Sequence, residues 1–308
     1  MDGVLVIDKP QGLTSHDVVA VARRALRESR IGHTGTLDPL ATGVLPLAIG
    51  RATRLVRFLT ASDKDYLASI RFGATTDSYD ADGQETSRSD RHPNRAALDA
   101  ALQDLRGRYD QLPPPFSAKK VGGQRAYDLA RRREDVTLTP VPVTVTRAEV
   151  LAFDGWSAQV ALTCSAGFYV RSFTHALGQA VGTGAYLEAL QRTRSGEFRL
   201  EEAMTLDGLY GDEDAPGARD GSREAVADWL IPMKELLKAF PAVVVTEEGR
   251  AWVGHGRELD PRVFRPDGSP PEPGATSWTR IFDADGRLLA LGKPGDTPGS
   301  LHPAVVLN

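Results

Sequence analysis

The chain has 308 residues, of which 41% are hydrophobic, and its formal net charge at pH 7 is −4. This length and apolar content predict about two domains with buried cores. A single cysteine excludes a disulfide framework and a multi-cysteine zinc site, and no apolar run is long enough to cross a membrane. We therefore expect a soluble protein of the reducing cytoplasm.

Charge is distributed unevenly along the chain. Residues 1–196 carry a net charge of +4, whereas residues 197–308 carry −8. Within the first part, residues 106–147 hold nine basic and four acidic residues. Because binding to phosphates follows local contacts, such a stretch is able to hold a nucleic-acid backbone, although a solvated helix face has the same composition.

The first elements are predicted from an apolar run and a helical repeat. Residues 3–7 are predicted as a strand that ends at a Pro/Gly turn, and Thr14 or Ser15 is a candidate N-cap. Apolar residues at helical spacing then predict a helix over about 16–29. Glycines and prolines recur in residues 31–50, so we expect a structured loop there rather than a long helix or strand.

The later elements alternate irregularly between strand and helix. Enrichment in Val, Ile and Thr predicts strands over 66–72, 141–152 and 158–164. Asn94 is predicted to cap a helix, and another short helix is expected after Arg171. Because no regular βαβ rhythm is present, we predict an α+β fold rather than a doubly wound sheet.

The last part of the chain has a composition of its own. A polar loop at 211–222 precedes it, and a Pro/Gly-rich loop is expected at 261–275. Runs of valine at 243–245 and 305–306 predict strands. We therefore expect a larger part over 1–238 and a small strand-rich module over 239–308.

Asp38 is the first candidate for chemistry. It precedes Pro39 in a loop rich in Gly and Thr, and His33 lies five residues upstream. An Asp before Pro often caps a turn, so spacing alone leaves a structural role open. The sequence lacks a P-loop ending, an HExxH motif, a GxSxG motif and a cysteine pair, and the lone Cys164 is expected to be a small buried hydrophobe.

Several motif blocks, one of which contains Asp38, follow one another along the chain. They lie at residues 8–15, 32–46 (GHTGTLDPLATGVLP), 64–77, 113–127, 164–172 and 190–196. Together they cover most of residues 3–205 and resemble the TruB family of bacterial tRNA pseudouridine-55 synthases. The resemblance implies the pseudouridine-synthase fold, with a mixed, mostly antiparallel central sheet flanked by helices.

The resemblance also implies a reaction and its central residues. Uridine 55 in the tRNA T-loop is isomerised: uracil is detached at N1, turned and rejoined through C5, with no cofactor and no metal. Asp38 matches the essential aspartate, either as a nucleophile on base or sugar or as the base that starts an elimination. Arg171 matches the arginine that pairs with this carboxylate, favours its charged form and orients it through bidentate hydrogen bonds.

Further residues match positions around the target base. Tyr66 matches a tyrosine that stacks on the base or helps to remove the C5 proton. Tyr169 and Leu190 match residues that line the pocket, although ordinary core positions would look the same. His33 matches a histidine that fills the space near the flipped nucleotide, and Lys9 either supports the Asp38 loop or contacts phosphate.

The resemblance extends to RNA binding. Residues 106–147 match a thumb-like insertion, in which Lys120 and Arg125 are suited to phosphate contacts, and residues 239–308 resemble a PUA-type RNA-binding module. The expected partner is tRNA through its T-arm; no membrane, no obligate protein partner and a monomer are expected. Three alternatives stay open: an rRNA-directed synthase, a guide-RNA-dependent relative, and a tRNA-binding folding helper.

Overall fold

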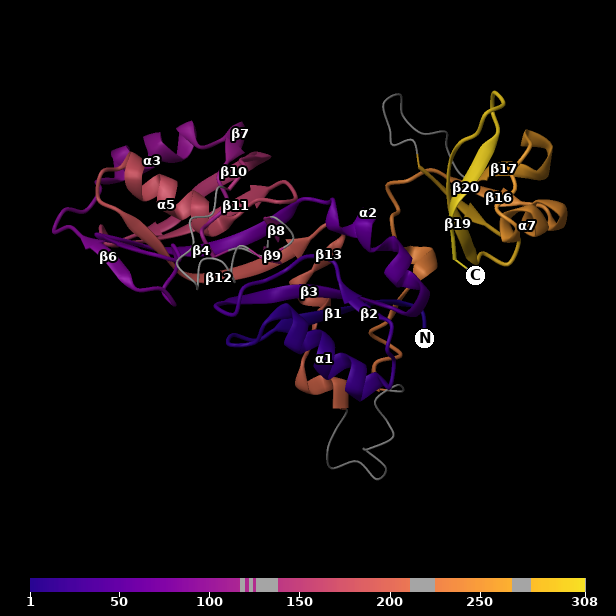
Figure 1. The fold of residues 1–308 in the computed structure, drawn as a ribbon, viewed down its shortest axis with the longest axis horizontal. Helices are drawn as coiled ribbons and strands as arrows, with labels where there is room; N and C mark the ends of the chain where they lie inside the picture. The colour runs from indigo at the N-terminus through magenta and orange to yellow at the C-terminus, as the bar shows by residue number, and fades with distance from the viewer. Residues whose placement is uncertain (117–119, 122–123, 126–137, 211–224, 268–277, 308) are drawn as a thin grey trace.

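The computed structural model describes residues 1–116, 120–121, 124–125, 138–210, 225–267 and 278–307. These residues form a large and a small sheet with helices packed against them, and two hairpins (Figure 1). The described helices are α1 (Ser15–Leu26), α2 (Val56–Thr60), α3 (Arg95–Asp104), α5 (Val170–Ala180) and α7 (Glu247–Gly254). None of them is long and apolar enough to cross a membrane.

The larger sheet has 11 strands among the described residues, in the order β14-β1-β3-β12-β4-β11-β10-β7, with β13, β15 and β2 attached beside this path. Its strands are β1 (Gly3–Lys9), β2 (Ile31–His33), β3 (Ala41–Ile49), β4 (Lys64–Phe72), β7 (Gly107–Gln111), β10 (Val141–Phe153), β11 (Ser157–Cys164), β12 (Ala185–Ser195), β13 (Phe198–Arg199), β14 (Met204–Thr205) and β15 (Ile231–Pro232). Only the β1–β14 and β3–β12 pairs are parallel among them. The predicted α+β fold with a mixed, mostly antiparallel sheet is confirmed.

The C-terminal part forms a five-stranded sheet in the order β17-β16-β18-β19-β20. Its strands are β16 (Ala242–Val245), β17 (Phe264–Asp267), β18 (Thr279–Phe282), β19 (Leu288–Pro294) and β20 (Leu301–Val306). The strand-rich C-terminal part is therefore confirmed. The loop expected at 261–275 is wrong at its beginning, because β17 pairs there with β16, and its remainder lies outside the described residues. The polar loop at 211–222 also lies outside them.

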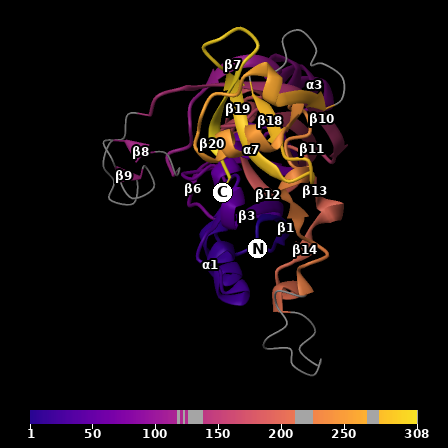
Figure 2. The ribbon, with the colours of Figure 1, turned by 90° about the vertical axis from the view of Figure 1, so that its right-hand side faces the viewer.

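The two sheets share a hydrophobic core. Side chains alternate along β1, so Leu5 and Ile7 join the cluster that also contains α1, α3 and α5, whereas Val4 and Val6 join a second cluster. That second cluster includes Phe282 and other residues of the C-terminal sheet. A strand buried on both faces shows a continuous apolar run, which explains the sequence of β1. Figure 2 shows the C-terminal sheet facing the viewer, with α1 below it.

Local signals correctly predicted the first and third helices. α1 begins after Thr14, whose hydroxyl accepts from the N–H of Asp17 while the Asp17 carboxylate accepts from the N–H of Thr14, a capping box. Asn94 caps α3 through a 2.8 Å hydrogen bond from the N–H of Ala97. The helices end at Leu26 and Asp104, close to where their apolar repeats end.

The prediction of a loop throughout 31–50 is wrong for its second half. Residues 41–49 form β3, of which residues 43–49 pair with β1. Gly43 adopts a φ of 98°, and a Cβ on it would lie 2.2 Å from the carbonyl oxygen of Arg192. Pro46 accepts a hydrogen bond from the N–H of Thr34 (3.1 Å), so its missing N–H falls on the side of short β2 rather than on the β1 ladder. Strand pairing therefore overrides the Gly and Pro signals.

The expected insertion at 106–147 lies partly outside the described residues. Its two ends are β7 and the first part of β10, which pair with each other at the edge of the larger sheet. Between them the structure describes β8 (Lys120–Val121) paired with β9 (Gln124–Arg125), whereas residues 117–119, 122–123 and 126–137 lie outside the described residues. A further hairpin joins β5 (Ala74–Thr76) and β6 (Glu85–Arg88).

Candidate active site

The segment between β2 and β3, here called the Asp38 loop (residues 34–40), is fixed by buried hydrogen bonds. The hydroxyl of Ser15, the first residue of α1, donates to the carbonyl of Leu37 (3.1 Å) and accepts from its N–H (2.8 Å). Such a two-way bond ties the loop to the start of the helix. The side chain of Asp38 therefore projects from a backbone that is held in one place.

Lys9, the last residue of β1, lies beneath the same loop with none of its surface exposed. Its ammonium donates to the carbonyls of Pro10 (2.9 Å), Leu13 (2.6 Å) and Pro39 (3.5 Å). Burial lowers the pKa of this ammonium to about 8. Of the two roles considered for Lys9, these contacts favour support of the loop. The other role expected for Lys9, a contact with phosphate, is not compatible with this burial, because a fully buried ammonium does not face an RNA backbone.

Arg192 on β12 holds the loop from the opposite side and is only 1% exposed. Its Nε donates to the carbonyl of Val44 (2.7 Å), Nη2 to that of Gly35 (3.1 Å) and Nη1 to that of Thr36 (3.4 Å). One buried cation thus connects the Asp38 loop and β3, and its charge acts to lower the pKa of the phenol of Tyr66, its register partner on β4. Sequence reasoning did not single out this residue.

Asp38 forms an ion pair with Arg171, in the first turn of α5. Asp38 Oδ2 lies 2.8 Å from Arg171 Nε, and the two side chains are 41% and 7% exposed. The Nε–H itself finds no acceptor along its direction among the described residues. The expected bidentate pairing is not formed, because Arg171 Nη1 and Nη2 donate to the carbonyls of Ser78 (3.2 Å) and Phe116 (2.9 Å).

A second carboxylate, Asp80, lies near the same guanidinium. Its Oδ2 is 3.5 Å from Arg171 Nε, and the residue is 5% exposed. The Ser78 hydroxyl and the Asp82 N–H (3.2 Å) both donate to Asp80 Oδ1. Burial raises the pKa of Asp80, partly opposed by the Ser78 hydroxyl and the charge of Arg171. Asp80 was missed from the sequence, because it stands in a polar, acidic turn that looks solvated.

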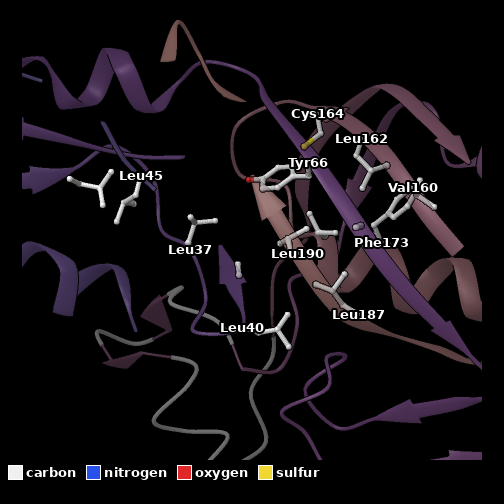
Figure 3. Close-up of a cluster of buried hydrophobic side chains, with 14 of the residues drawn as sticks. Leu37, Leu40, Leu45, Tyr66, Val160, Leu162, Cys164, Phe173, Leu187 and Leu190 are labelled. Atoms are coloured by element: carbon white, nitrogen blue, oxygen red, sulfur yellow. The ribbon is translucent and has the colours of Figure 1, made fainter. Parts of the chain in front are cut away.

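Tyr66 lies on β4, where it is the register partner of Arg192 on β12 and of Leu162 on β11. It is 8% exposed, and burial raises the pKa of its phenol, while the guanidinium of Arg192 acts in the opposite direction. Figure 3 shows its ring among buried side chains, with Leu190 beside it and Leu37 of the Asp38 loop on the side of its hydroxyl.

These groups surround a pocket of about 150 Å³. It is lined by Thr36, Leu37, Asp38, Tyr66, Phe168, Tyr169, Val170, Arg171 and Leu190. The structure therefore brings together all three residues predicted for catalysis and both residues predicted to line the pocket. The pocket lies where the Asp38 loop, β4, β12 and the start of α5 meet.

The wall that carries Tyr169 is held by Gln111, at the end of β7. The Gln111 amide donates through Nε2 to the Tyr169 carbonyl (3.0 Å) and accepts through Oε1 from the Tyr169 N–H (2.8 Å). Gln111 is buried, so this pair of hydrogen bonds is shielded from water. It connects the edge strand at the base of the insertion to the start of α5.

His33, like Lys9, is not among the residues that line the pocket. His33 on β2 accepts at Nδ1 from the N–H of Gly35 (3.3 Å), and its ring centroid is 5.8 Å from that of His16. Burial and the neighbouring charges lower the pKa of His33, which favours the neutral ring. Lys120 and Arg125 are register partners across the β8–β9 hairpin.

Within the described ranges no group of three or more His, Cys, Asp or Glu side chains is placed to hold a metal ion. The lone cysteine, Cys164, is buried near Tyr66 (Figure 3), and burial raises the pKa of its thiol to about 12. It packs as the small hydrophobe that was expected.

Comparison with known proteins gives the family. A model described as the TruB family pseudouridylate synthase (N terminal domain) matches residues 23–170, and one described as the tRNA pseudouridylate synthase B C-terminal domain matches residues 171–238. A curated relative from Solibacter usitatus (strain Ellin6076), named tRNA pseudouridine synthase B, is 44% identical over 308 residues, 100% of both chains. A relative of the same name from Mycobacterium tuberculosis (strain ATCC 25618 / H37Rv) is 47% identical over 315 residues, with 98% of each chain covered.

Solved structures agree on the fold. The chain is similar to a chain of the archaeal box H/ACA sRNP Nop10-Cbf5 complex, with a TM-score of 0.72, 26% identity, and 99% of this chain and 86% of that one covered. A chain of an H/ACA RNP bound to a substrate RNA containing 2'-deoxyuridine gives the same score and identity, with 99% and 85% covered. Fold and comparisons together define a pseudouridylate synthase, which is an isomerase. The chain belongs to the TruB family of these enzymes.

Proposed function

We propose that the protein converts uridine 55 in the T-loop of tRNA to pseudouridine, with Asp38 as the residue that attacks or deprotonates the nucleotide. The names of the curated relatives support tRNA as the substrate. The observation that carries the proposal is the placement of Asp38. Its partly exposed carboxylate opens into the pocket and lies 2.8 Å from the buried guanidinium of Arg171.

The dimensions of the pocket suit one pyrimidine ring. An engineered protein cavity of similar volume accepts benzene, so a space of about 150 Å³ accommodates a single six-membered ring. Tyr66 offers an aromatic face, and Leu190 offers an apolar surface beside it. A base inside a folded RNA loop reaches such a pocket only when it is flipped out of its stack.

The reaction we propose needs no co-reactant. The N1–C1′ bond of the uridine breaks, a C5–C1′ bond forms, C5 loses its proton and N1 gains one, so atoms and electrons balance within the nucleotide. Asp38 acts either as a nucleophile towards the base or the sugar, or as the base that starts an elimination. Arg171, held by the carbonyls of Ser78 and Phe116, orients the carboxylate throughout.

Tyr66 has a more restricted role in this proposal. Burial raises the pKa of its phenol, so the protonated form predominates near neutral pH. A protonated phenol is a poor base for the C5 proton. These surroundings favour stacking of the ring on the flipped base as the main contribution of Tyr66.

We further propose that binding of the T-arm uses other parts of the chain. Residues 1–238 supply the whole pocket, and within them Lys120 and Arg125 contact phosphates from the β8–β9 hairpin. His33 fills the space that the flipped nucleotide vacates. Residues 239–308 act as a PUA-like module, in which the net negative charge restricts the area available for phosphate contacts.

The first test uses purified protein and an unmodified tRNA transcript that carries tritium at C5 of its uridines. With EDTA present and no cofactor added, we expect release of tritium into water and modification at position 55. Asp38→Asn should abolish release while tRNA binding stays within a few-fold, because a reacting group rather than a phosphate contact is lost. Asp90→Asn, at an exposed carboxylate outside the pocket, is the matched control. Near-normal release by Asp38→Asn would refute the assignment.

A second candidate is a guide-RNA-dependent synthase. It is favoured by the similarity to H/ACA complexes, whereas the tRNA enzymes are more similar in sequence. Turnover of free tRNA by the purified, monomeric chain would exclude this dependence, and turnover of defined rRNA fragments instead of tRNA would favour an rRNA-directed synthase. If the chain refolds tRNA and shows no tritium release, it is a folding helper.

A further inference from the structure

The turn between β5 and β6 contains a strained residue next to the groups that hold Arg171. Tyr79 has a φ of 65°, in the left-handed region that bulky side chains rarely adopt. The residue before it, Ser78, offers its carbonyl to Arg171 Nη1 (3.2 Å), and the residue after it, Asp80, lies 3.5 Å from Arg171 Nε. The strained residue therefore separates two contacts to the same guanidinium.

The ring of Tyr79 stacks on His175 of α5. The ring centroids are 3.9 Å apart, and the planes are inclined by 14°. His175 follows Arg171 by four residues and so lies one helical turn further along the same face of α5. Leu187 of β12 adds backbone bonds to the turn, donating from its N–H to the Tyr79 carbonyl (3.0 Å). The turn is thus attached to α5 at two adjacent points, the guanidinium and the stack.

A glycine or an asparagine would adopt this backbone conformation with less strain. The presence of a tyrosine at this position is therefore explained by a contact of its side chain. That contact is with His175 of α5, and Tyr79 is not among the described residues that line the pocket. Strain held by surrounding structure beside a reacting group is a recurring feature of functional sites.

We infer that Tyr79 is a positioning residue: its stack on His175 holds the turn against α5, so that Ser78 and Asp80 keep Arg171 directed at Asp38. The inference rests on the proposed function. It predicts that loss of the stack lets the turn move away from α5, which leaves Arg171 less well oriented and slows the chemical step without changing how tRNA binds.

The test compares Tyr79→Gly with Tyr79→Phe in the full chain, using the tritium-release assay at saturating tRNA. Tyr79→Gly removes the ring and relieves the backbone strain, so its thermal midpoint should stay close to that of the wild type. Its kcat should fall about two- to tenfold, the range expected for one aromatic pair, with an unchanged Kd for tRNA. Tyr79→Phe keeps the stack and should restore kcat. His175→Ala should lower kcat to the same extent, and the Tyr79→Gly, His175→Ala double variant should fall no further.

The outcomes separate the inference from the proposed function. A wild-type kcat in Tyr79→Gly, with the wild-type enzyme active, would overturn the inference alone. The inference would also be overturned if kcat fell in Tyr79→Gly together with the thermal midpoint and Tyr79→Phe did not restore it, since that result indicates a merely structural residue. An inactive wild-type chain would refute the proposed function itself.

Discussion

Replacement of Arg192 by methionine is the sharpest test of how the Asp38 loop is built. The change keeps an apolar stem of similar length and removes every hydrogen-bond donor. The carbonyls of Val44, Gly35 and Thr36 would then lose this donor; the bond to Val44 is buried, and the other two are partly buried. Because unpaired buried carbonyls are unfavourable, we expect the folded state to be destabilised.

The size of the effect follows from the bond lengths. Two of the three bonds, at 2.7 and 3.1 Å, have good geometry, and the third, at 3.4 Å, is weak. A hydrogen bond from a charged donor contributes about 1.5–3 kcal/mol. Removal of the buried cation relieves part of its desolvation penalty, which offsets some of this loss. We therefore expect the free energy of unfolding to fall by about 3 kcal/mol.

Urea unfolding monitored by circular dichroism measures this change, and Arg194→Met is the matched control. Arg194 lies on the same strand, but it is more exposed and pairs with Asp65 through two hydrogen bonds of 2.6 and 2.8 Å. Such a partly exposed pair contributes up to about 1 kcal/mol. If Arg192→Met costs no more than Arg194→Met, the view that Arg192 holds the loop is refuted.

Three further predictions concern the core, the buried lysine and the hairpin. Phe198→Ala should lower the free energy of unfolding in urea by about 3–5 kcal/mol, because this buried ring lies in the cluster shared by the two sheets; a loss below about 1 kcal/mol would contradict that packing. The pKa of Lys9 is about 8 in the folded protein, against an ordinary value of 10.5. Between these two pH values the unfolded chain therefore binds more protons at Lys9 than the folded chain does. Wild-type stability relative to Lys9→Met should therefore rise with pH across this window, and parallel pH profiles of the two proteins would contradict it. Lys120→Ala with Arg125→Ala should weaken tRNA binding and lower the slope of log affinity against log salt by up to about one unit per lost phosphate contact; an unchanged slope would mean that neither residue touches the backbone.

Local features of the sequence determined α1, α3 and several strands. The capping box at Thr14, the cap at Asn94 and the apolar repeats that follow them act within a few residues of the chain, so they were readable without knowledge of the fold. The motif blocks likewise pointed to Asp38, Tyr66, Arg171 and the pocket residues, because the resemblance depends on the order of blocks along the chain.

Contacts between distant segments were decided only by the tertiary structure. β3 forms despite Gly43 and Pro46 because its neighbours in the sheet supply the pairing. Those neighbours are β1, near the start of the chain, and β12, more than 130 residues further along. Asp80 becomes part of the site only when its turn packs against α5. The sequence around Asp80, taken alone, is equally typical of an acidic turn that is exposed to solvent.

The same distinction applies to the buried cations. The sequence placed Lys9 beside a turn and Arg192 within the motif block at 190–196, but it did not show that both the ammonium and the guanidinium are directed at carbonyls of the Asp38 loop. Which polar group is buried, and which acceptor it meets, depends on how strands far apart in the chain pack together. The residue types for the chemistry were therefore set by the sequence, and their orientation was set by the fold.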